Sequence, residues 1–258
     1  MATGTALVTG ATAGIGAAFA DRLAAEGHDV VLVARDEGRL RAAAHELRGR
    51  YNVLVDVLPA DLSTEEGQAA VAARLADPDR PVEVLVNNAG FSLNTSFLRS
   101  TVDDEERLLR LNVNAVMRLT HAALGGMTSR RRGAIINVSS VAGFGVAMPG
   151  STYPASKAWV TSFTESVAMS AARFDVRLMA LCPGYTRTGY HERAGVDMSR
   201  LPGWLWLDSD ELVRDALRDL RRGKVVSVPD WKYKIVAFSL RHLPRRMIRM
   251  GARDTRGA

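Results

Sequence analysis

The stretch that decides the fold is Thr5–Gly16, which reads TALVTGATAGIG. Its first five residues are apolar or β-branched and fit a buried strand, and the residues after the glycines have helical periodicity. Glycines at positions 10, 14 and 16 would let the backbone turn sharply and approach a pyrophosphate, which free N–H groups at a helix start would stabilise. Because the spacing differs from the usual G-x-G-x-x-G, a glycine turn that serves packing alone remains an equal alternative for this loop.

The rest of the chain repeats the same strand-then-helix rhythm, with Gly27 expected as a helix C-cap. This alternation predicts an α/β fold of the Rossmann type, a single domain with a doubly wound, seven-stranded parallel sheet flanked by helices. We expect residues 1–190 to form the dinucleotide-binding and catalytic core, 190–222 a substrate loop and helix, and 223–258 the last strand and a basic amphipathic tail. The stretch Tyr190–Trp206 interrupts the rhythm and is expected to be an insertion above the sheet. The expected strands are Thr5–Thr9, Asp29–Ala34, Asn52–Val57, Val82–Asn87, Ala134–Ser139, Asp175–Leu181 and Val225–Val228, and the expected helices cover residues 15–26, 36–48, 64–76, 103–127, 154–172 and 208–222.

The composition of the 258-residue chain is that of a globular protein, with 47% hydrophobic and 24% charged residues. Its apolar runs are far shorter than the ~20 residues that cross a bilayer, and its first residues lack the pattern of a secretory signal, so we expect a cytoplasmic protein. A single cysteine, Cys182, excludes an intramolecular disulfide and a cysteine-based metal cage, and the histidines show no ligand spacing. No metal is therefore predicted.

The net charge of +6 is concentrated at one end of the chain. Residues 221–258 hold 11 Lys or Arg against 2 acids, so the remainder carries a net charge of −3. The body of the protein therefore has no positive field that would explain nucleic-acid binding.

The end of the second expected strand selects the cofactor. Folds that bind NAD usually place an acid there, about 20 residues beyond the glycines, to accept the ribose hydroxyls. Here an alanine is followed by Arg35, whose guanidinium suits a 2′-phosphate, and Arg39 and Thr12 could complete the pocket. Asp36 and Glu37 could repel a phosphate, or could be first-turn residues that complement a helix dipole. NADP(H) is therefore predicted over NAD(H).

Tyr153 and Lys157 lie four positions apart at the start of a helical stretch, so both side chains project from one helix face. An ammonium beside a tyrosine favours the phenolate and lowers the pKa of the phenol, which could then act as an acid or base near neutral pH. For the pair alone, chance remains an alternative. Ser140 follows another strand and would reach the same carboxyl edge of the sheet, where open α/β folds bind ligands.

Six motifs together resemble the short-chain dehydrogenase/reductase family over residues 4 to 190. The segment from Arg221 to Lys234 is similar to an NADP(H)-preferring branch that includes 3-oxoacyl and keto-lipid reductases. The motifs are TGATAGIG (9–16), NNAG (87–90), LNVNA (111–115), NVSS (137–140), YPASK (153–157) and CPGYTRT (182–188).

The resemblance implies a role for each catalytic candidate. Tyr153 would give its proton to a substrate carbonyl while hydride leaves the nicotinamide, and Lys157 would bond the nicotinamide ribose and lower the tyrosine pKa. Ser140, rather than Ser139, would hydrogen-bond the carbonyl oxygen. Asn112 would kink its helix and hold a water that joins the lysine to a proton relay; without the family, an Asn that bonds a neighbouring carbonyl would be favoured.

The resemblance also implies cofactor contacts. Asp61 with Leu62 would contact the adenine; the alternative for Asp61 is a turn or N-cap residue after a strand. Either Thr186 or Thr188 would fix the nicotinamide carboxamide, because the family usually has an aliphatic residue at the first position. The candidate cofactor-binding residues are Gly10, Thr12, Ala13, Gly14, Ile15, Gly16, Arg35, Arg39, Asp61, Leu62, Asn88, Ala89, Gly90, Tyr153, Lys157, Pro183, Gly184, Thr186 and Thr188.

Beyond residue 231, apolar side chains are interleaved with Lys and Arg around Pro244. This tail could rest on anionic lipid, cover an apolar substrate pocket, or be a dimer-packing or core-covering helix with solvated arginines. Trp204 and Trp206 either roof the substrate site or belong to the core.

The sequence as a whole predicts an NADPH-dependent reductase of an apolar ketone, such as an acyl or lipid-like chain. One alternative is an NADP⁺-linked alcohol or steroid dehydrogenase in the oxidative direction. A second is a non-catalytic dinucleotide sensor or scaffold, against which the intact set Asn112, Ser140, Tyr153 and Lys157 argues. We expect a small-molecule substrate and, by analogy, a homodimer or homotetramer.

Overall fold

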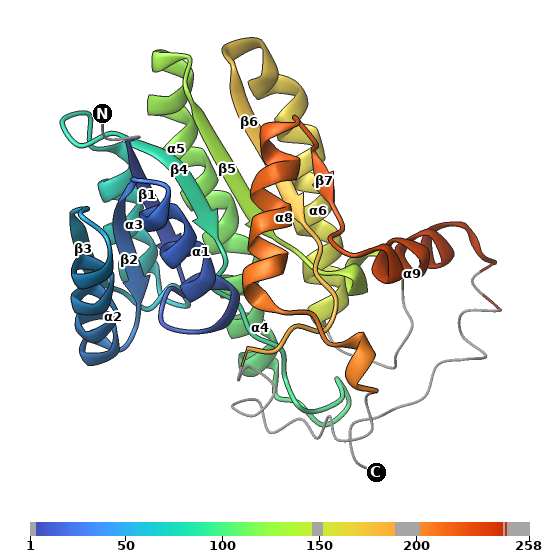
Figure 1. Cartoon of the computed structure of the whole chain (residues 1–258). Coiled ribbons are helices and arrows are strands. Elements are labelled where there is room, and N and C mark those ends of the chain that lie inside the picture. The colour runs from blue at the N-terminus through green and yellow to red at the C-terminus, as the bar shows by residue number, and fades with distance from the viewer. Residues whose placement is uncertain (1–3, 146–151, 189–201, 245, 247–258) are drawn as a thin grey trace.

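The computed structural model describes residues 4–145, 152–188, 202–244 and 246. These residues form one seven-stranded sheet, all parallel, in the order β3-β2-β1-β4-β5-β6-β7 (Figure 1). The predicted fold class and strand number are confirmed. The strands are β1 (Thr5–Thr9), β2 (Asp29–Ala34), β3 (Val55–Pro59), β4 (Val82–Asn87), β5 (Gly133–Val138), β6 (Val176–Leu181) and β7 (Val226–Ser227).

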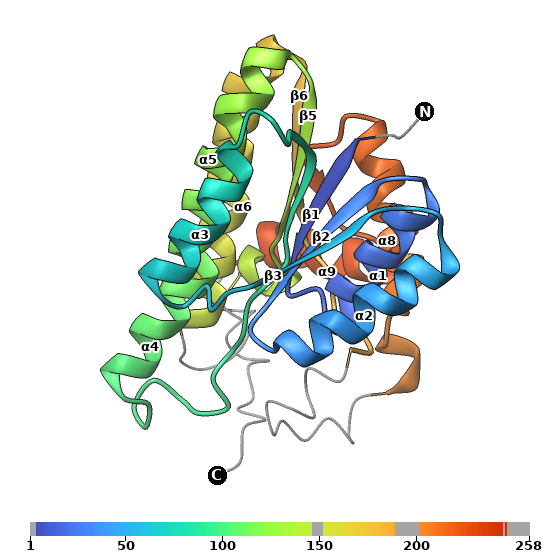
Figure 2. The same ribbon diagram turned by 90° about the vertical axis from the view of Figure 1, so that its left-hand side faces the viewer.

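Helices cover both faces of the sheet (Figure 2). One face packs against α1 (Gly14–Ala25), α2 (Glu37–Arg50) and α8 (Ser209–Arg221). The other packs against α3 (Glu65–Ala76), α5 (Val116–Arg130) and α6 (Thr152–Ala171), with α4 (Val102–Leu109) before α5. Helix α9 (Trp231–His242) lies at the side of the sheet that β7 occupies, next to the 3₁₀ turn Val141–Phe144 (Figure 1). Two further 3₁₀ turns are Ala172–Phe174 and Gly203–Leu205.

The central strands are buried on both faces because their apolar side chains alternate between two cores. In β1, Ala6 and Val8 belong to the core under α1, α2 and α8, whereas Leu7 belongs to the core under α3, α5 and α6. This is the reason that β1, β2 and β4 read in the sequence as near-continuous apolar runs.

The helical stretch expected over residues 103–127 is confirmed, but it is not a uniform α-helix. The structure has α4, then a π-helical turn over Arg110–Ala115, then α5. A π turn accommodates an extra residue, usually for a tertiary reason. Here the turn contains the fully buried Asn112, whose side chain bonds the backbone of Phe91 instead of its own helix.

Because the strands are parallel, the loops after them meet at one edge of the sheet. Gly10 follows β1, Arg35 follows β2, Asn88 follows β4, Ser140 follows β5 and Pro183 comes shortly after β6. Of the insertion expected over residues 190–206, only 202–206 fall within the described residues. The division of the chain into core, substrate region and tail stays a prediction.

Candidate active site

The glycine loop between β1 and α1 is bent back against its own strand. Gly10 and Gly14 have φ of 67° and 54°, a conformation that L side chains rarely adopt. A Cβ on Gly16 would stand 2.2 Å from the carbonyl oxygen of Gly10, so only glycine fits there. Ala13 occupies the N-cap of α1 without a side-chain hydrogen bond, and the first turn of α1 carries no acid. Thr12 lies in the same loop and Ile15 in the first turn of α1. A sharply turned loop that leads into a helix start without an acid fits the phosphates of a dinucleotide.

Asn88 braces this loop from the neighbouring strand. Its side-chain amide donates to the Thr9 carbonyl at 2.9 Å, and the backbone N–H groups of Asn88 and Ala89 both donate to Thr9 Oγ1 at 3.0 Å. The predicted adenosine contact of Asn88 is untested, but its amide is already engaged with the loop. A Cβ on Gly90 would stand 3.0 Å from Asn112 Oδ1 and 3.5 Å from Lys157 Nζ, which places Gly90 between this loop and the catalytic candidates.

Two exposed arginines stand at the end of β2. The guanidinium of Arg39 donates to the Thr12 carbonyl at 2.9 Å, which joins α2 to the glycine loop. Asp36 accepts the Arg39 N–H at 3.0 Å as the N-cap of α2, and Glu37 pairs with Arg41 at the helix surface. The interpretation of these acids as helix-start residues is therefore confirmed, and Arg35 and Arg39 suit a phosphate.

Asp61 forms a turn after β3. Its Oδ1 accepts from Ser63 N at 2.9 Å and from Ser63 Oγ at 2.7 Å, while the N-cap of α3 is Thr64. Burial alone would raise the pKa of Asp61, but the Ser63 hydrogen bonds and the charge of Arg35 outweigh it and hold that pKa below its ordinary value. The turn interpretation is thus correct. The Leu62 side chain is buried in the core, which leaves only its backbone for a cofactor.

Tyr153 and Lys157 project from the first turns of α6. Lys157 Nζ lies 5.7 Å from the centre of the Tyr153 ring and donates to the Val138 carbonyl at 2.8 Å. Lys157 is only 5% exposed. Burial lowers its pKa to about 8, an effect that the neighbouring Cys182 thiol partly opposes. The site therefore holds its cation at a considerable desolvation cost.

The two serines after β5 have different environments. The hydroxyl of Ser139 is buried and bonds Lys157 O and Thr161 Oγ1, both at 2.7 Å, so it joins β5 to α6. Ser140 is half-buried and caps the following 3₁₀ turn by accepting from Ala142 N at 3.1 Å. A hydroxyl that accepts a bond can still donate its own proton. This geometry favours Ser140, as the resemblance implies.

Asn112 connects three segments of the site. Its Nδ2 donates to Phe91 O at 2.8 Å, its Oδ1 accepts from Phe91 N at 3.1 Å, and Nδ2 also lies 3.4 Å from Ser156 Oγ. Ser156 in turn donates to the Tyr153 carbonyl at 2.7 Å. Asn112 thus bonds a carbonyl, as the alternative interpretation expected, although that carbonyl belongs to Phe91 on another segment; its implied water remains a prediction.

The N-terminus of α6 is held by a residue that the sequence analysis missed. Glu105 on α4 is buried, although carboxylates are seldom buried without partners. Its carboxylate accepts from Ser100 Oγ at 2.7 Å, from the Thr152 hydroxyl, and from the Thr152 N–H at 3.4 Å. A carboxylate at this helix start also complements the helix dipole. Glu105 therefore links α4 to the residue that precedes Tyr153.

The loop after β6 is closed by Tyr233, which also escaped the sequence analysis. A Cβ on Gly184 would stand 2.1 Å from the Tyr233 ring, so the ring packs directly on this glycine. The Tyr233 hydroxyl accepts from Tyr185 N at 3.1 Å and donates to Leu205 O at 2.7 Å. Burial raises the pKa of Tyr233. The only sequence signal was an aromatic residue at helical spacing inside a basic segment.

The two candidate threonines are separated by the structure. Thr186 is buried and donates to Gly184 O at 3.1 Å, and it pairs with Leu207 in a β-bridge. Thr188 is half-buried against the glycine loop, since a Cβ on Gly14 would stand 2.5 Å from Thr188 Cβ. Thr188 is therefore the better candidate for the carboxamide, while Pro183 supports the site through its carbonyl, which accepts from Val141 N at 3.0 Å.

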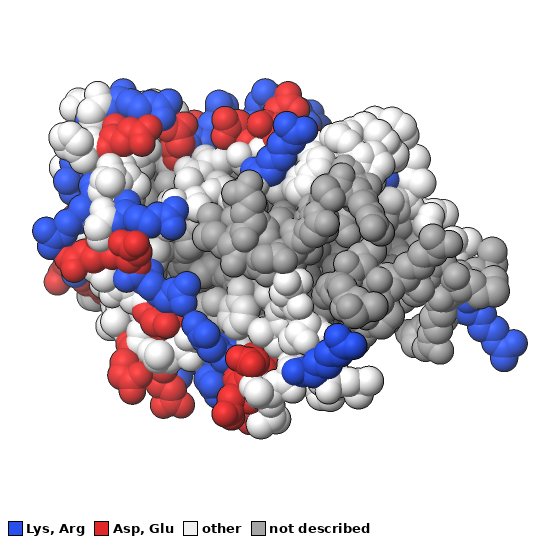
Figure 3. All heavy atoms as spheres, turned by 90° about the horizontal axis from the view of Figure 1, so that it is seen from below, with Lys and Arg blue, Asp and Glu red and all other residues white. Residues whose placement is uncertain are grey.

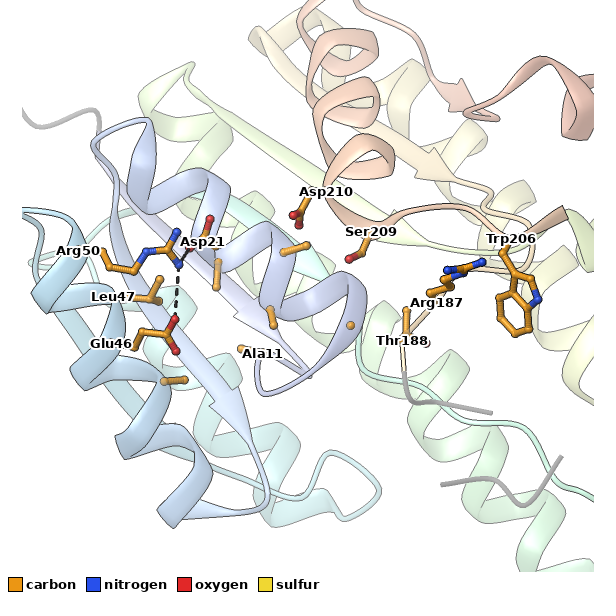
Figure 4. Close-up of a pocket in the computed structure, with 15 residues that line it drawn as sticks. Ala11, Asp21, Glu46, Leu47, Arg50, Arg187, Thr188, Trp206, Ser209 and Asp210 are labelled. Atoms are coloured by element: carbon orange, nitrogen blue, oxygen red, sulfur yellow. Dashed lines mark hydrogen bonds and ion pairs between the residues drawn. The ribbon is translucent and has the colours of Figure 1, made fainter. Parts of the chain in front are cut away.

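A groove of about 850 Å³ runs along the outer side of α1 (Figure 4). At one end Arg50 pairs with Asp21 at 2.7 Å, and at the other Thr188 and Trp206 reach it beside the glycine loop. Its lining residues, all in the described part of the chain, include none of the four catalytic candidates. The groove thus approaches the glycine loop from the α1 side.

Trp206 packs at a tilt against Tyr185, with ring centres 6.3 Å apart. Trp204 is 63% exposed, so its assignment to the core is wrong. The proposed roof over the substrate stays a prediction for both. Within the ranges that the structure describes, no three His, Cys, Asp or Glu side chains gather as a metal site would require, and no helix is both long and apolar enough to cross a bilayer.

The glycine loop from Gly10 to Gly16 and the Tyr153–Lys157 pair lie at the same edge of the sheet, an arrangement typical of a dehydrogenase. Residues 4–198 match the family model described as short chain dehydrogenase, and the chain therefore belongs to the short-chain dehydrogenase/reductase family. It is 40% identical over 195 residues to the monensin polyketide synthase putative ketoacyl reductase of Streptomyces virginiae, which covers 73% of this chain and 72% of that protein.

Two solved structures are similar to this protein over nearly the whole chain. A short-chain dehydrogenase from Sphingobium yanoikuyae in complex with NADPH is 36% identical, with a TM-score of 0.85 and coverage of 92% of this chain and 93% of that one. The bulky-bulky ketone specific alcohol dehydrogenase from Comamonas testosteroni is 31% identical, with a TM-score of 0.81 and coverage of 96% and 90%.

Proposed function

We propose that this enzyme reduces an apolar ketone to a secondary alcohol with NADPH as the hydride donor. The observation that carries the proposal is the position of Lys157, whose buried ammonium lies 5.7 Å from the Tyr153 ring. A protein that only bound a dinucleotide could use Lys157 to bond the nicotinamide ribose, but it would gain nothing from a phenol held beside this buried cation. This argument disfavours a non-catalytic sensor or scaffold.

The residues that would hold NADPH lie along the carboxyl edge of the sheet. The glycine loop from Gly10 to Gly16 would receive the pyrophosphate, Arg35 and Arg39 the 2′-phosphate, and Asp61 the adenine. Bound NADPH would supply the hydride. The related Sphingobium enzyme was solved with NADPH, which supports the choice of cofactor.

The chain's own groups would perform the proton transfer. Ser140 would donate a hydrogen bond to the substrate carbonyl oxygen, and the Tyr153 hydroxyl would give that oxygen its proton as charge develops there. The Lys157 ammonium would stabilise the phenolate that remains. A positioned general acid of this kind contributes roughly 10² to 10⁴ in rate.

The apolar substrate class is supported by the relatives, which include a ketoacyl reductase and an enzyme specific for bulky-bulky ketones. The oxidative direction, as an NADP⁺-linked alcohol or steroid dehydrogenase, uses the same residues in reverse. A cytoplasmic location and a homodimeric or homotetrameric assembly stay predictions.

The test is the Tyr153→Phe variant, measured against Tyr51→Phe as a tyrosine variant remote from the site. We expect Tyr153→Phe to lower kcat at least ~10²-fold with NADPH affinity nearly unchanged, because only the proton donor is lost. The substrate screen should use ketones of graded chain length with NADPH and NADH in parallel. Unchanged turnover of Tyr153→Phe, or a preference for NADH, would contradict the proposal.

A further inference from the structure

Helix α9 has two unlike faces. Tyr233 and Ala237 are buried against the body of the protein, whereas Trp231, Ile235 and Phe238 are 67%, 57% and 63% exposed. The spacing of these three residues, i, i+4 and i+7, places them in one row along the helix, which we call the α9 stripe. Isolated exposed apolar residues are ordinary, but a row of large ones on a single helix face marks a contact surface.

The stripe continues beyond the helix. Trp204, which is itself exposed, lies beside its start, because Lys232 Nζ donates to the Trp204 carbonyl at 2.8 Å. Seen from the carboxyl edge of the sheet, the described surface at the end where α9 lies is mostly uncharged, whereas acidic and basic side chains alternate around the opposite end (Figure 3).

Basic residues flank the stripe. By helical spacing Lys234 stands on one side of the α9 stripe, and Lys232, which pairs with Asp230 at 3.2 Å, stands on the other. Residues 231–258 contain 8 Lys or Arg and a single acid, so that segment carries a net charge of +7 and the rest of the chain −1. An apolar row that contains Trp and Phe and is bordered by Lys and Arg is the pattern of a helix lying in a membrane interface.

We propose that α9 docks, through this stripe, on a membrane surface rich in anionic phospholipids. Charge decides between the occupants: a second copy related by two-fold symmetry would bring the two Lys234 cations to one apolar interface, and α9 has no acid to pair with them. A bilayer with anionic headgroups instead pairs the cations and buries the aromatic rings together. The stripe cannot act as a flap over the substrate, since it faces away from the site that the opposite side of α9 covers.

The proposed docking surface is separate from the proposed reaction, but it affects the route by which the substrate reaches the active site. The buried side of α9 reaches the site in three places: Tyr233 packs on Gly184, Arg241 lies 4.1 Å over the Phe144 ring, and a Cβ on Gly145 would stand 3.1 Å from the Leu240 carbonyl. The helix that rests on the lipid is therefore also a wall of the active site. An apolar ketone dissolved in the bilayer would enter beside it without crossing water.

Vesicle flotation of the full-length protein tests the proposal. We expect it to float with vesicles of phosphatidylcholine and phosphatidylglycerol, and roughly tenfold less with phosphatidylcholine alone or in high salt. Ile235→Ser combined with Phe238→Ser should weaken binding at least roughly tenfold. The matched control, Leu54→Ser with Met169→Ser, removes two even more exposed apolar side chains elsewhere and should leave binding unchanged.

A charge variant provides the second arm. Lys234→Glu should weaken binding roughly thirtyfold, because each basic residue near an anionic surface contributes about 1 kcal/mol and the reversal counts twice. Arg214→Glu, on α8, is its control. The proposal is overturned if the wild type does not float with the anionic vesicles, if the stripe variant floats equally well, or if the protein binds an acidic protein but no vesicle. Flotation measures membrane binding and does not depend on catalysis. A negative flotation result would therefore overturn the docking proposal without contradicting the proposed reaction.

Discussion

Replacing Lys157 with methionine should make the unliganded protein more stable while it abolishes the catalytic role of the residue. The lysine is buried, and burial lowers its pKa from 10.5 to about 8. The folded protein therefore binds this proton less tightly than the unfolded chain does, by about 3 kcal/mol. Methionine has a similar length and carries no charge to desolvate.

The expected gain is smaller than this figure because one hydrogen bond is lost. The Val138 carbonyl, which accepts from Lys157 Nζ at 2.8 Å, would lose its donor at a cost of about 1 kcal/mol. The net gain at pH 7 is therefore about 2 kcal/mol, which corresponds to a rise in Tm of roughly 4 to 8 °C.

The gain should depend on pH in a defined direction. Between pH 8 and 10.5 the unfolded chain holds more protons at this site than the folded protein, so the stability of the wild type rises with pH there. The penalty is fully present below pH 8 and shrinks above it. We therefore expect the advantage of the methionine variant to fall to about 1 kcal/mol by pH 9.

Urea unfolding of the cofactor-free proteins between pH 6.5 and 9 measures this difference. The control is Lys234→Met, which removes an exposed lysine and should change stability by no more than about 0.5 kcal/mol. The reasoning is refuted if Lys157→Met is no more stable than the wild type at pH 7, or if its advantage does not decline by pH 9.

Three further substitutions probe the site. Gly16→Ala would force the glycine loop apart and should weaken NADPH binding roughly tenfold or more, as measured by fluorescence titration. Gly49 has open space around it, so Gly49→Ala should bind NADPH normally. Equal binding by both variants would contradict the role of the glycine loop in holding the cofactor. Arg35→Ala should raise the KM for NADPH roughly tenfold and leave that for NADH unchanged, whereas a parallel rise in both would argue against a 2′-phosphate contact. Glu105→Ala should destabilise the protein by about 2 kcal/mol, because Ser100 and Thr152 lose their hydrogen-bond acceptor. The exposed control Glu106→Ala should cost no more than about 0.5 kcal/mol. Similar losses for both variants in thermal denaturation would count against a structural role of the buried Glu105 carboxylate.

The sequence predicted the bounds of β1, β2 and β4 to the residue because these strands are buried and end at turns. Prediction was poorer at the edge of the sheet. Strand β3 begins at Val55 rather than Asn52, since it has a neighbour on one side only and Leu54 before it is 74% exposed. An edge strand needs no continuous apolar run, so its start leaves a weak signal.

Features that depend on distant partners were not predictable. The family resemblance implied a kink at Asn112, but the π turn there follows from a bond to the backbone of Phe91, and a helical pattern of apolar residues carries no trace of it. The same holds for Glu105 and Tyr233, whose roles come from Thr152 and Gly184 on other elements. The glycine loop and the Tyr153–Lys157 pair, by contrast, were found because their chemistry is encoded at short spacing.

The packing of Tyr233 on Gly184 also bears on the order in which the enzyme is completed during synthesis. The loop after β6 receives its covering from a helix whose Tyr233 bonds Tyr185, 48 residues earlier in the chain. A nascent chain on the ribosome can therefore assemble the first six strands while the loop after β6 still lacks its cover. That part of the active site is completed only when α9 has left the exit tunnel and Tyr233 can pack on Gly184.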